Sequence, residues 1–305
     1  MELGYEIEFL KMGLWVRFMT TRFVLLTLLS ILFVHTALAR APVWEVSKEG
    51  NTLYIGGTIH VLRTTDYPLP AAFEEAYEKA DVLAFEADAR KMSDPGVSAL
   101  IMKRGAYPQG ETLLDHLRPE TVEKLKEYSA GLGMPYTFLV PMRPGLVLSM
   151  LSMLEIQKLG FSYKGVDETY LTQADADGKE LLFLESLEEQ IDFIAQLGLG
   201  NEDKLIAYTI ESSQDISGML EDMVSSWRDG DVSKLDKLLV QEMDAFPKIR
   251  EDLLIGRNKA WIPSIRAWME TSEIEFVLVG AGHLVGEESV LELLEAEGFI
   301  VRQME

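Results

Sequence analysis

Two segments of the chain share one pattern: an apolar stretch, then Gly-x-x-His, then an amphipathic stretch and a second apolar stretch. The first segment begins with TLYIGGTIHVL at 52–62 and the second with EIEFVLVGAGH at 273–283. Apolar, β-branched runs that stop at glycine predict strands followed by turns. Because strands that alternate with helices pair in parallel, the pattern predicts an α/β fold with a sheet built from two related halves.

The rest of each half follows the same order. In the first half, a helix is expected over 69–80 and a short strand over 81–88. In the second half, a helix over 287–298 precedes a last strand in FIVRQ. The sequence between the halves contains long helical patterns and one strand, ELLFLES at 180–186. A large helical insertion between the two halves is therefore predicted.

The N-terminal region has the features of a targeting segment. Arg22 precedes an apolar run at 23–34, and Ala37-Leu38-Ala39 forms a cleavage pattern. Residues 1–39 are predicted to be a signal peptide, with Met19 as the start that fits best. The folded domain is then 40–305, and the protein is expected to be periplasmic or secreted, with no stable membrane span after cleavage. An uncleaved N-terminal membrane anchor is the alternative.

Composition excludes several kinds of function. A net charge of −22 provides no basic surplus to neutralise phosphates, so a nucleic-acid partner is not expected. The absence of cysteine rules out disulfides, thiol nucleophiles and cysteine-ligated zinc. The four histidines are therefore the only imidazoles available for metal binding or acid–base chemistry, and one of them, His35, lies in the predicted signal peptide.

The glycines of the second segment allow a different interpretation, a dinucleotide-binding turn. Gly280, Gly282 and Gly286 follow a strand, as glycines that approach a pyrophosphate do. That fold also needs an acidic residue at the end of the next strand to bind the ribose, and FIVRQ ends without one. Glu287 and Glu288 at the start of the expected helix would repel a phosphate. A turn that presents His283 is the better interpretation.

The predicted strands bring polar side chains to one edge of the sheet. In an open α/β sheet, ligands bind beyond the carboxyl ends of the strands. His60 and His283 follow two of these strands, and Glu86 and Glu185 follow two others. Two imidazoles with one or two carboxylates suit a divalent transition metal.

The chain resembles the TraB/GumN family, which includes the TIKI metalloproteases. The supporting segments are LYIGGTIHVL, DVLAFEAD, KGVDETYL, LLFLESLEEQ, GRNKAW and FVLVGAGHLVGEESVLELLEAEGF, and the likeness covers about 43–305. The family's motif residues fall on Gly57, His60, Glu86, Arg257, Asn258, Gly280 and His283. The resemblance implies a metal-dependent peptidase on an α/β sheet, within a superfamily similar to erythromycin esterases and to haem-binding ChaN-type proteins.

Chemical roles for the metal site follow from residue type. His60, His283 and Glu86 are predicted to hold a divalent metal (manganese, cobalt or zinc) that lowers the pKa of a bound water and polarises a carbonyl. Glu86 is either a metal ligand or the general base, and Glu185 takes the role that Glu86 does not fill.

The remaining candidates have open alternatives. Arg257 could stabilise an oxyanion or hold a substrate carboxylate, or it could form an ion pair with Glu86 or Asp167. Asn258 could orient a ligand or bond to the backbone. Asp167 is expected to cap the helix that follows KGVD.

These observations favour a metal-dependent, peptidase-like hydrolase of the cell envelope that acts on a peptide or a small amide or ester. Two other functions fit the same residues. One is a protein that binds a metal or haem without turnover, and the other is a hydrolase similar to the erythromycin esterases. The sequence does not define an oligomeric state.

Overall fold

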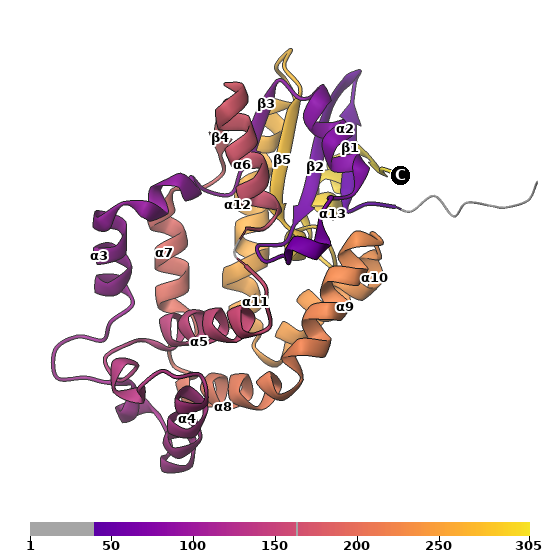
Figure 1. Cartoon of the computed structure of the whole chain (residues 1–305). Coiled ribbons are helices and arrows are strands. Elements are labelled where there is room, and N and C mark those ends of the chain that lie inside the picture. The colour runs from indigo at the N-terminus through magenta and orange to yellow at the C-terminus, as the bar shows by residue number, and fades with distance from the viewer. Residues whose placement is uncertain (1–39, 163) are drawn as a thin grey trace, which may run out of the picture. The chain divides into compact units, whose positions relative to one another are not determined.

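The sheet has six strands in the order β4-β3-β5-β2-β1-β6. Figure 1 shows five of them, from β4 to β1, in this order. The structure is a computed structural model that describes residues 40–162 and 164–305. The four strands β4, β3, β5 and β2 are parallel, whereas β1 is antiparallel to both β2 and β6. This arrangement confirms the predicted α/β class. The strands are β1 (Val43–Lys48), β2 (Asn51–Thr58), β3 (Val82–Phe85), β4 (Glu180–Phe183), β5 (Glu275–Gly280) and β6 (Ile300–Gln303).

The register of the parallel strands aligns their carboxyl ends. The last residue of β2, Thr58, pairs with the last residue of β5, Gly280. The last residue of β3, Phe85, pairs with the last residue of β4, Phe183. The residues that follow these four strands therefore leave the sheet at the same edge.

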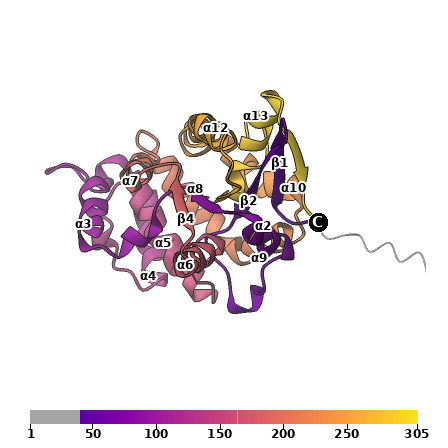
Figure 2. The same cartoon turned by 90° about the horizontal axis from the view of Figure 1, so that it is seen from above.

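Helices cover both faces of the sheet. Successive side chains of a strand point to opposite faces, and here the strands place apolar side chains on both faces. Tyr54 and Phe276 contribute to the core on one face, and Ile55 and Val277 contribute to the core on the other. In Figure 2, the helices at 71–79, 166–177 and 216–228 lie on one side of the sheet and those at 256–268 and 290–296 lie on the other. On the first face lie α2 (Ala71–Lys79), α6 (Val166–Asp177), α9 (Ile216–Arg228) and α10 (Val232–Leu239), and on the second lie α12 (Gly256–Trp268) and α13 (Val290–Ala296).

Part of the helical insertion has a core of its own. This core lies between α4, α5 and α8 and includes Leu125, Leu151 and Ile206. Helix α5 enters its first turn through proline, and α6 ends at Gly178, which has a positive φ of 69°. The remaining helices are α3 (Pro95–Arg104), α4 (Pro119–Gly131), α5 (Pro144–Lys158), α7 (Leu187–Gln196), α8 (Glu202–Ser212) and α11 (Pro247–Arg250).

The strands of the two predicted halves lie in one sheet. Strand β5 of the second half lies between β2 and β3 of the first half. Strand β6 pairs with β1, and the two crossover helices α2 and α13 lie on opposite faces of the sheet. That the two halves are related stays a prediction.

The predicted signal peptide at 1–39, with Met19 and His35, lies outside the described residues. From Arg40 to Glu305 the chain clusters as one unit. Within the part of the chain that the structure describes, no helix is both long and apolar enough to cross a membrane.

We expect Glu275→Gln to stabilise the protein at neutral pH by about 1 kcal/mol. Glu275 is 2% exposed at the start of β5, its Oε2 is buried without a hydrogen-bond partner among the described residues, and burial raises its pKa. Because the pKa of Glu275 is raised in the folded state, its ionisation lowers the free energy of unfolding at a pH above that pKa. The effect disappears below the unfolded-state pKa of about 4.3, where the group is protonated in both states.

Urea unfolding at neutral and acidic pH measures this effect. The gain should shrink as the pH falls, and Glu270, an exposed glutamate before β5, should show no such gain when it is changed to Gln. An equal gain for Glu275→Gln at both pH values would contradict the assignment.

Candidate active site

The first Gly-x-x-His turn contacts the helical insertion. Strand β2 ends at Thr58, whose Oγ1 donates to Oδ1 of Asp167 at 2.7 Å. Nδ1 of His60 lies 2.9 Å from Oδ2 of the same carboxylate. Since an ionised carboxylate only accepts hydrogen bonds, Nδ1 of His60 carries the proton that it donates. The His60 side chain is otherwise open to solvent, with 66% of its surface exposed.

The prediction that Asp167 caps a helix is wrong. The N-cap position of α6 is Gly165, with no side-chain cap, and Asp167 lies inside the first turn. Both carboxylate oxygens of Asp167 accept hydrogen bonds from the β2 segment instead. Asp167 therefore bonds to Thr58 and His60, which are more than a hundred residues away in the sequence, and does not form the local helix cap that its residue type favours.

The second Gly-x-x-His turn is buried. His283 ends the short 3₁₀ helix Ala281–His283, and its Nδ1 lies 2.6 Å from Oδ1 of Asn258. Nδ2 of Asn258 donates to the carbonyl of Glu288 at 2.9 Å, so its Oδ1 is free to accept. Nη1 of Arg257 lies 3.2 Å from Nε2 of His283. Because a guanidinium only donates, Nε2 accepts and Nδ1 carries the proton.

Glu86 lies between the two turns. It follows β3, and its Oε1 accepts a hydrogen bond from the backbone N–H of Gly280 at 2.7 Å. Its Oε2 accepts from Nη2 of Arg257 at 2.7 Å and from Nε2 of Gln190 at 3.1 Å. Oε1 also lies 3.8 Å from Nε2 of His283. A Cβ atom at Gly280 would lie 3.3 Å from Glu86 Oε1, so glycine allows this close approach.

Glu185 is bound on both oxygens. Its Oε1 accepts from Nε of Arg257 at 2.7 Å and from Nε1 of Trp261 at 2.8 Å. Its Oε2 accepts from Nη2 of Arg257 at 2.8 Å, which completes a bidentate pair. The guanidinium of Arg257 also lies over the indole of Trp261, 4.9 Å from the ring centroid. Glu185 therefore belongs to a largely buried cluster of charges.

Every N–H of the Arg257 guanidinium is engaged. Besides its bonds to the two glutamates and His283, Nη1 donates to the carbonyl of Leu253 at 3.2 Å. Leu253 lies in the π-helical turn Glu251–Ile255, which leads into α12. Of the predicted alternatives for Arg257, the structure contains the ion pair with Glu86 and adds a second with Glu185, while Asp167 pairs with His60.

The electrostatics of the two histidines are opposite. Asp167 is the main cause that raises the pKa of His60 to about 9. Burial, reinforced by the charge of Arg257, lowers the pKa of His283 to about 4. Burial would raise the pKa of Glu86, but His283 and Arg257 outweigh it and lower that pKa to about 2. At neutral pH, Glu86 is therefore ionised and His283 is neutral.

The structure brings the predicted site residues to one edge of the sheet. Five of them are joined by hydrogen bonds into one cluster, and His60 is near enough for its pKa to respond to Glu86 and Arg257. Gln190 and Trp261 also bond to this cluster and had no predicted role in it. The LESLEEQ segment that contains Gln190 was part of the family resemblance. The five predicted site residues that hydrogen bonds join into this cluster are Glu86, Glu185, Arg257, Asn258 and His283.

The donor chemistry of this cluster fits a divalent metal. His283 is neutral with its lone pair on Nε2, and an ionised Glu86 oxygen lies 3.8 Å from it. Two carboxylates and one guanidinium leave an excess of one negative charge. In the described residues, no three His, Asp or Glu side chains are already gathered as a ligand set. His60 bonds through Nδ1, so Nε2 is the nitrogen through which it could bind a metal once that nitrogen has lost its proton.

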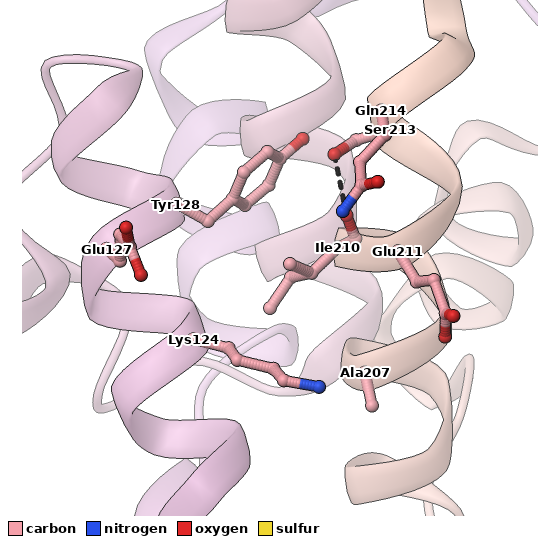
Figure 3. Close-up of a pocket in the computed structure, with 8 residues that line it drawn as sticks. All are labelled: Lys124, Glu127, Tyr128, Ala207, Ile210, Glu211, Ser213 and Gln214. Carbon is pink, nitrogen blue, oxygen red and sulfur yellow. Dashed lines mark hydrogen bonds between the residues drawn. The ribbon is translucent and has the colours of Figure 1, made fainter.

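A cavity of about 380 Å³ lies elsewhere, between α4 and α8 (Figure 3). None of the predicted site residues lines it. Charged and polar side chains from both helices surround it, with Lys124 opposite Glu211. The cavity is therefore separate from the candidate active site. Its lining is Lys124, Glu127, Tyr128, Ala207, Ile210, Glu211, Ser213 and Gln214.

The fold and this cluster define an α/β protein that places two Gly-x-x-His turns and a buried arginine–glutamate group at one sheet edge. The chain belongs to the TraB/PrgY/gumN family, whose model matches residues 42–303. The family predicted from the sequence motifs is thereby confirmed.

The chain is distantly similar to metalloproteases. It is 24% identical to metalloprotease TIKI1 of Danio rerio, over 85% of this chain and 62% of the relative. It is 23% identical to metalloprotease TIKI2 of Danio rerio, over 81% and 57%. It is 24% identical to human metalloprotease TIKI1, over 85% and 61%. The chain thus spans about three fifths of the length of these relatives, and no solved structure matches it.

Arg257→Gln should lower the free energy of unfolding by about 3 kcal/mol, because it leaves two largely buried carboxylates without their cation. Adding Glu86→Gln and Glu185→Gln should recover part of this loss. Urea unfolding measures both changes.

Arg266, an exposed arginine on the same helix, provides the matched control. Its change to Gln should alter stability by less than about 0.5 kcal/mol. Equal effects at Arg257 and Arg266 would show that the buried cluster does not stabilise the fold.

Proposed function

We propose that this protein is a metal-dependent hydrolase of the cell envelope that cleaves a peptide or a small amide or ester. The observation that carries the proposal is the neutral His283 with its Nε2 lone pair 3.8 Å from the ionised Glu86. An imidazole lone pair and a carboxylate at this spacing form part of a ligand set for a divalent cation. The metalloprotease names of the relatives support the same reaction class.

Three residues would hold the metal: His60, His283 and Glu86. Manganese, cobalt and zinc all suit imidazole with carboxylate. When bound, the metal would lower the pKa of a water and polarise the carbonyl of the substrate. Nδ1 of each histidine is bonded to another side chain, so Nε2 is the nitrogen left for the reaction in both.

The two glutamates have different tasks in this proposal. Glu185 accepts three hydrogen bonds and forms the bidentate pair, which makes it a positioning residue for Arg257. Among the described residues, Oε1 of Glu86 accepts a hydrogen bond only from the N–H of Gly280, so this oxygen retains a lone pair near His283. Glu86 is therefore the carboxylate that acts directly, either as a ligand or as the base that takes the proton of the attacking water.

Arg257 can provide a hydrogen-bond donor to the substrate when Nε2 of His283, which now accepts from its Nη1, binds another group. Nη1 donates to Nε2 of His283 in the structure. When that nitrogen binds another group, the N–H is released beside the site. It can then donate to the oxygen that becomes negative as the water attacks the carbonyl.

A second candidate function is hydrolysis by acid–base chemistry of the histidines without a metal. The bond between His60 and Asp167 favours it, because a histidine oriented by a carboxylate can transfer protons during acyl transfer. Metal or haem binding without turnover is the third possibility. Metal content and turnover distinguish the three.

Purified protein should contain about one transition metal per chain, either as isolated or after reconstitution with manganese, cobalt or zinc. The His60→Ala/His283→Ala double variant should lose it, and His116→Ala, which removes a histidine outside the site, should keep it. Elemental mass spectrometry gives the ratio. No metal in the wild type after reconstitution would remove the metal-dependent proposal and leave hydrolysis by acid–base chemistry of the histidines.

Glu86→Gln separates ligand from base. If Glu86 is the base, the variant keeps its metal, and hydrolysis of a peptide library falls about 100-fold or more. If Glu86 is a ligand, metal and activity are lost together. A metal-loaded wild type that hydrolyses no peptide, amide or ester would instead favour binding without turnover.

A further inference from the structure

Among the residues that the structure describes, Asp167 is the acidic side chain of α6 that hydrogen-bonds to the first Gly-x-x-His turn. It lies on α6, away from the strand ends that supply Glu86 and Glu185. Its two oxygens accept from Thr58 Oγ1 at 2.7 Å and from His60 Nδ1 at 2.9 Å. One carboxylate thus holds both the end of β2 and the histidine that follows it.

The backbone around Asp167 is fixed against the same turn. The N–H of Val166 donates to the carbonyl of Ile59 at 3.0 Å. A Cβ atom at Gly165 would lie 2.2 Å from that carbonyl oxygen, so only glycine permits this approach. On the other side of His60, Leu62 and Ser162 exchange backbone hydrogen bonds at 3.1 and 3.0 Å. The carboxylate is therefore held in place independently of His60.

The two histidines differ in what holds them. The His283 side chain is 5% exposed and packs against the Trp261 ring, with the centroids 4.4 Å apart. The His60 side chain is 66% exposed. An exposed side chain keeps its rotamer freedom unless a specific bond removes it. Among the described residues, His60 makes one side-chain hydrogen bond, and its partner is Asp167. This bond is therefore what fixes the direction of the ring.

We propose that Asp167 is a positioning residue of the active site. It fixes the His60 imidazole with Nδ1–H donated to the carboxylate and with Nε2 left for the reaction. What Nε2 does rests on the proposed metal-dependent function, but the orientation of the ring does not. Asp167 thereby makes α6 of the helical insertion part of the site.

The first test examines the ring itself in metal-free protein. The wild type should show a downfield proton resonance from His60 Nδ1–H in NMR spectra, assigned by its loss in His60→Ala. Asp167→Asn should remove or shift this resonance, because an amide in place of the carboxylate weakens the acceptor. Glu168→Gln makes the same charge change one residue along and should leave the resonance unaltered.

The second test measures cobalt(II) affinity and the visible absorption spectrum of the cobalt protein. Asp167→Asn should weaken binding about 10- to 100-fold and change the spectrum, as the loss of a partner behind a metal-binding histidine does. Thr58→Val, which removes the other bond to Asp167, should weaken binding less. Glu168→Gln should bind as the wild type does, and all three variants should unfold at the wild-type temperature.

The outcomes separate the two proposals. If the wild type binds no cobalt(II) but Asp167→Asn alone alters the His60 resonance, the metal-dependent function fails and the positioning role stands. If cobalt(II) binds and Asp167→Asn matches the wild type in affinity, spectrum and resonance, the positioning role is overturned and the metal-dependent function is untouched. A resonance altered equally by Glu168→Gln also overturns it, because the effect is then one of general charge.

Discussion

The geometry of the site depends on the hydrogen bonds that the guanidinium of Arg257 donates to three other side chains of the site. The guanidinium joins α12 to Glu86 after β3, to Glu185 after β4 and to His283 after β5. Three parallel strands can place their following residues at one edge, but they do not fix the directions of the side chains. A planar cation with every N–H engaged does, because each bond sets both a distance and an angle. The same residue also sets the protonation states, since its charge favours ionised Glu86 and neutral His283.

One motif used twice gives two chemically different histidines. The ring of His283 donates to a neutral amide, that of Asn258, and is buried against an indole. The ring of His60 donates to a carboxylate and is open to solvent. Burial lowers one pKa and the carboxylate raises the other, so at neutral pH His283 is neutral and His60 is protonated.

Sequence patterns predicted the parts of the site that the backbone determines. Strand ends place His60, His283, Glu86 and Glu185 at one edge, and period and glycine position are enough to find strand ends. Arg257 and Asn258 came from the family resemblance. Residue type alone predicts a local cap for Asp167. This prediction is wrong because its partners, Thr58 and His60, are more than a hundred residues away and meet it only where the insertion returns to the sheet. The π-helical turn before α12, whose Leu253 carbonyl accepts from Arg257, has no comparable sequence signal.

Stability alone does not account for the charged cluster. Replacing a buried ion-pair group by apolar side chains of similar volume is often neutral or stabilising, because desolvation offsets the attraction between the charges. The α12 face beside the cluster is already apolar, with Ile262 and Ile265 packed against the sheet. A hydrophobic replacement of Arg257, Glu86 and Glu185 would extend this core. An arrangement that instead keeps a carboxylate ionised beside a neutral imidazole has its clearest use in chemistry at the sheet edge, which is why the cluster supports the proposed hydrolase more than it explains the fold.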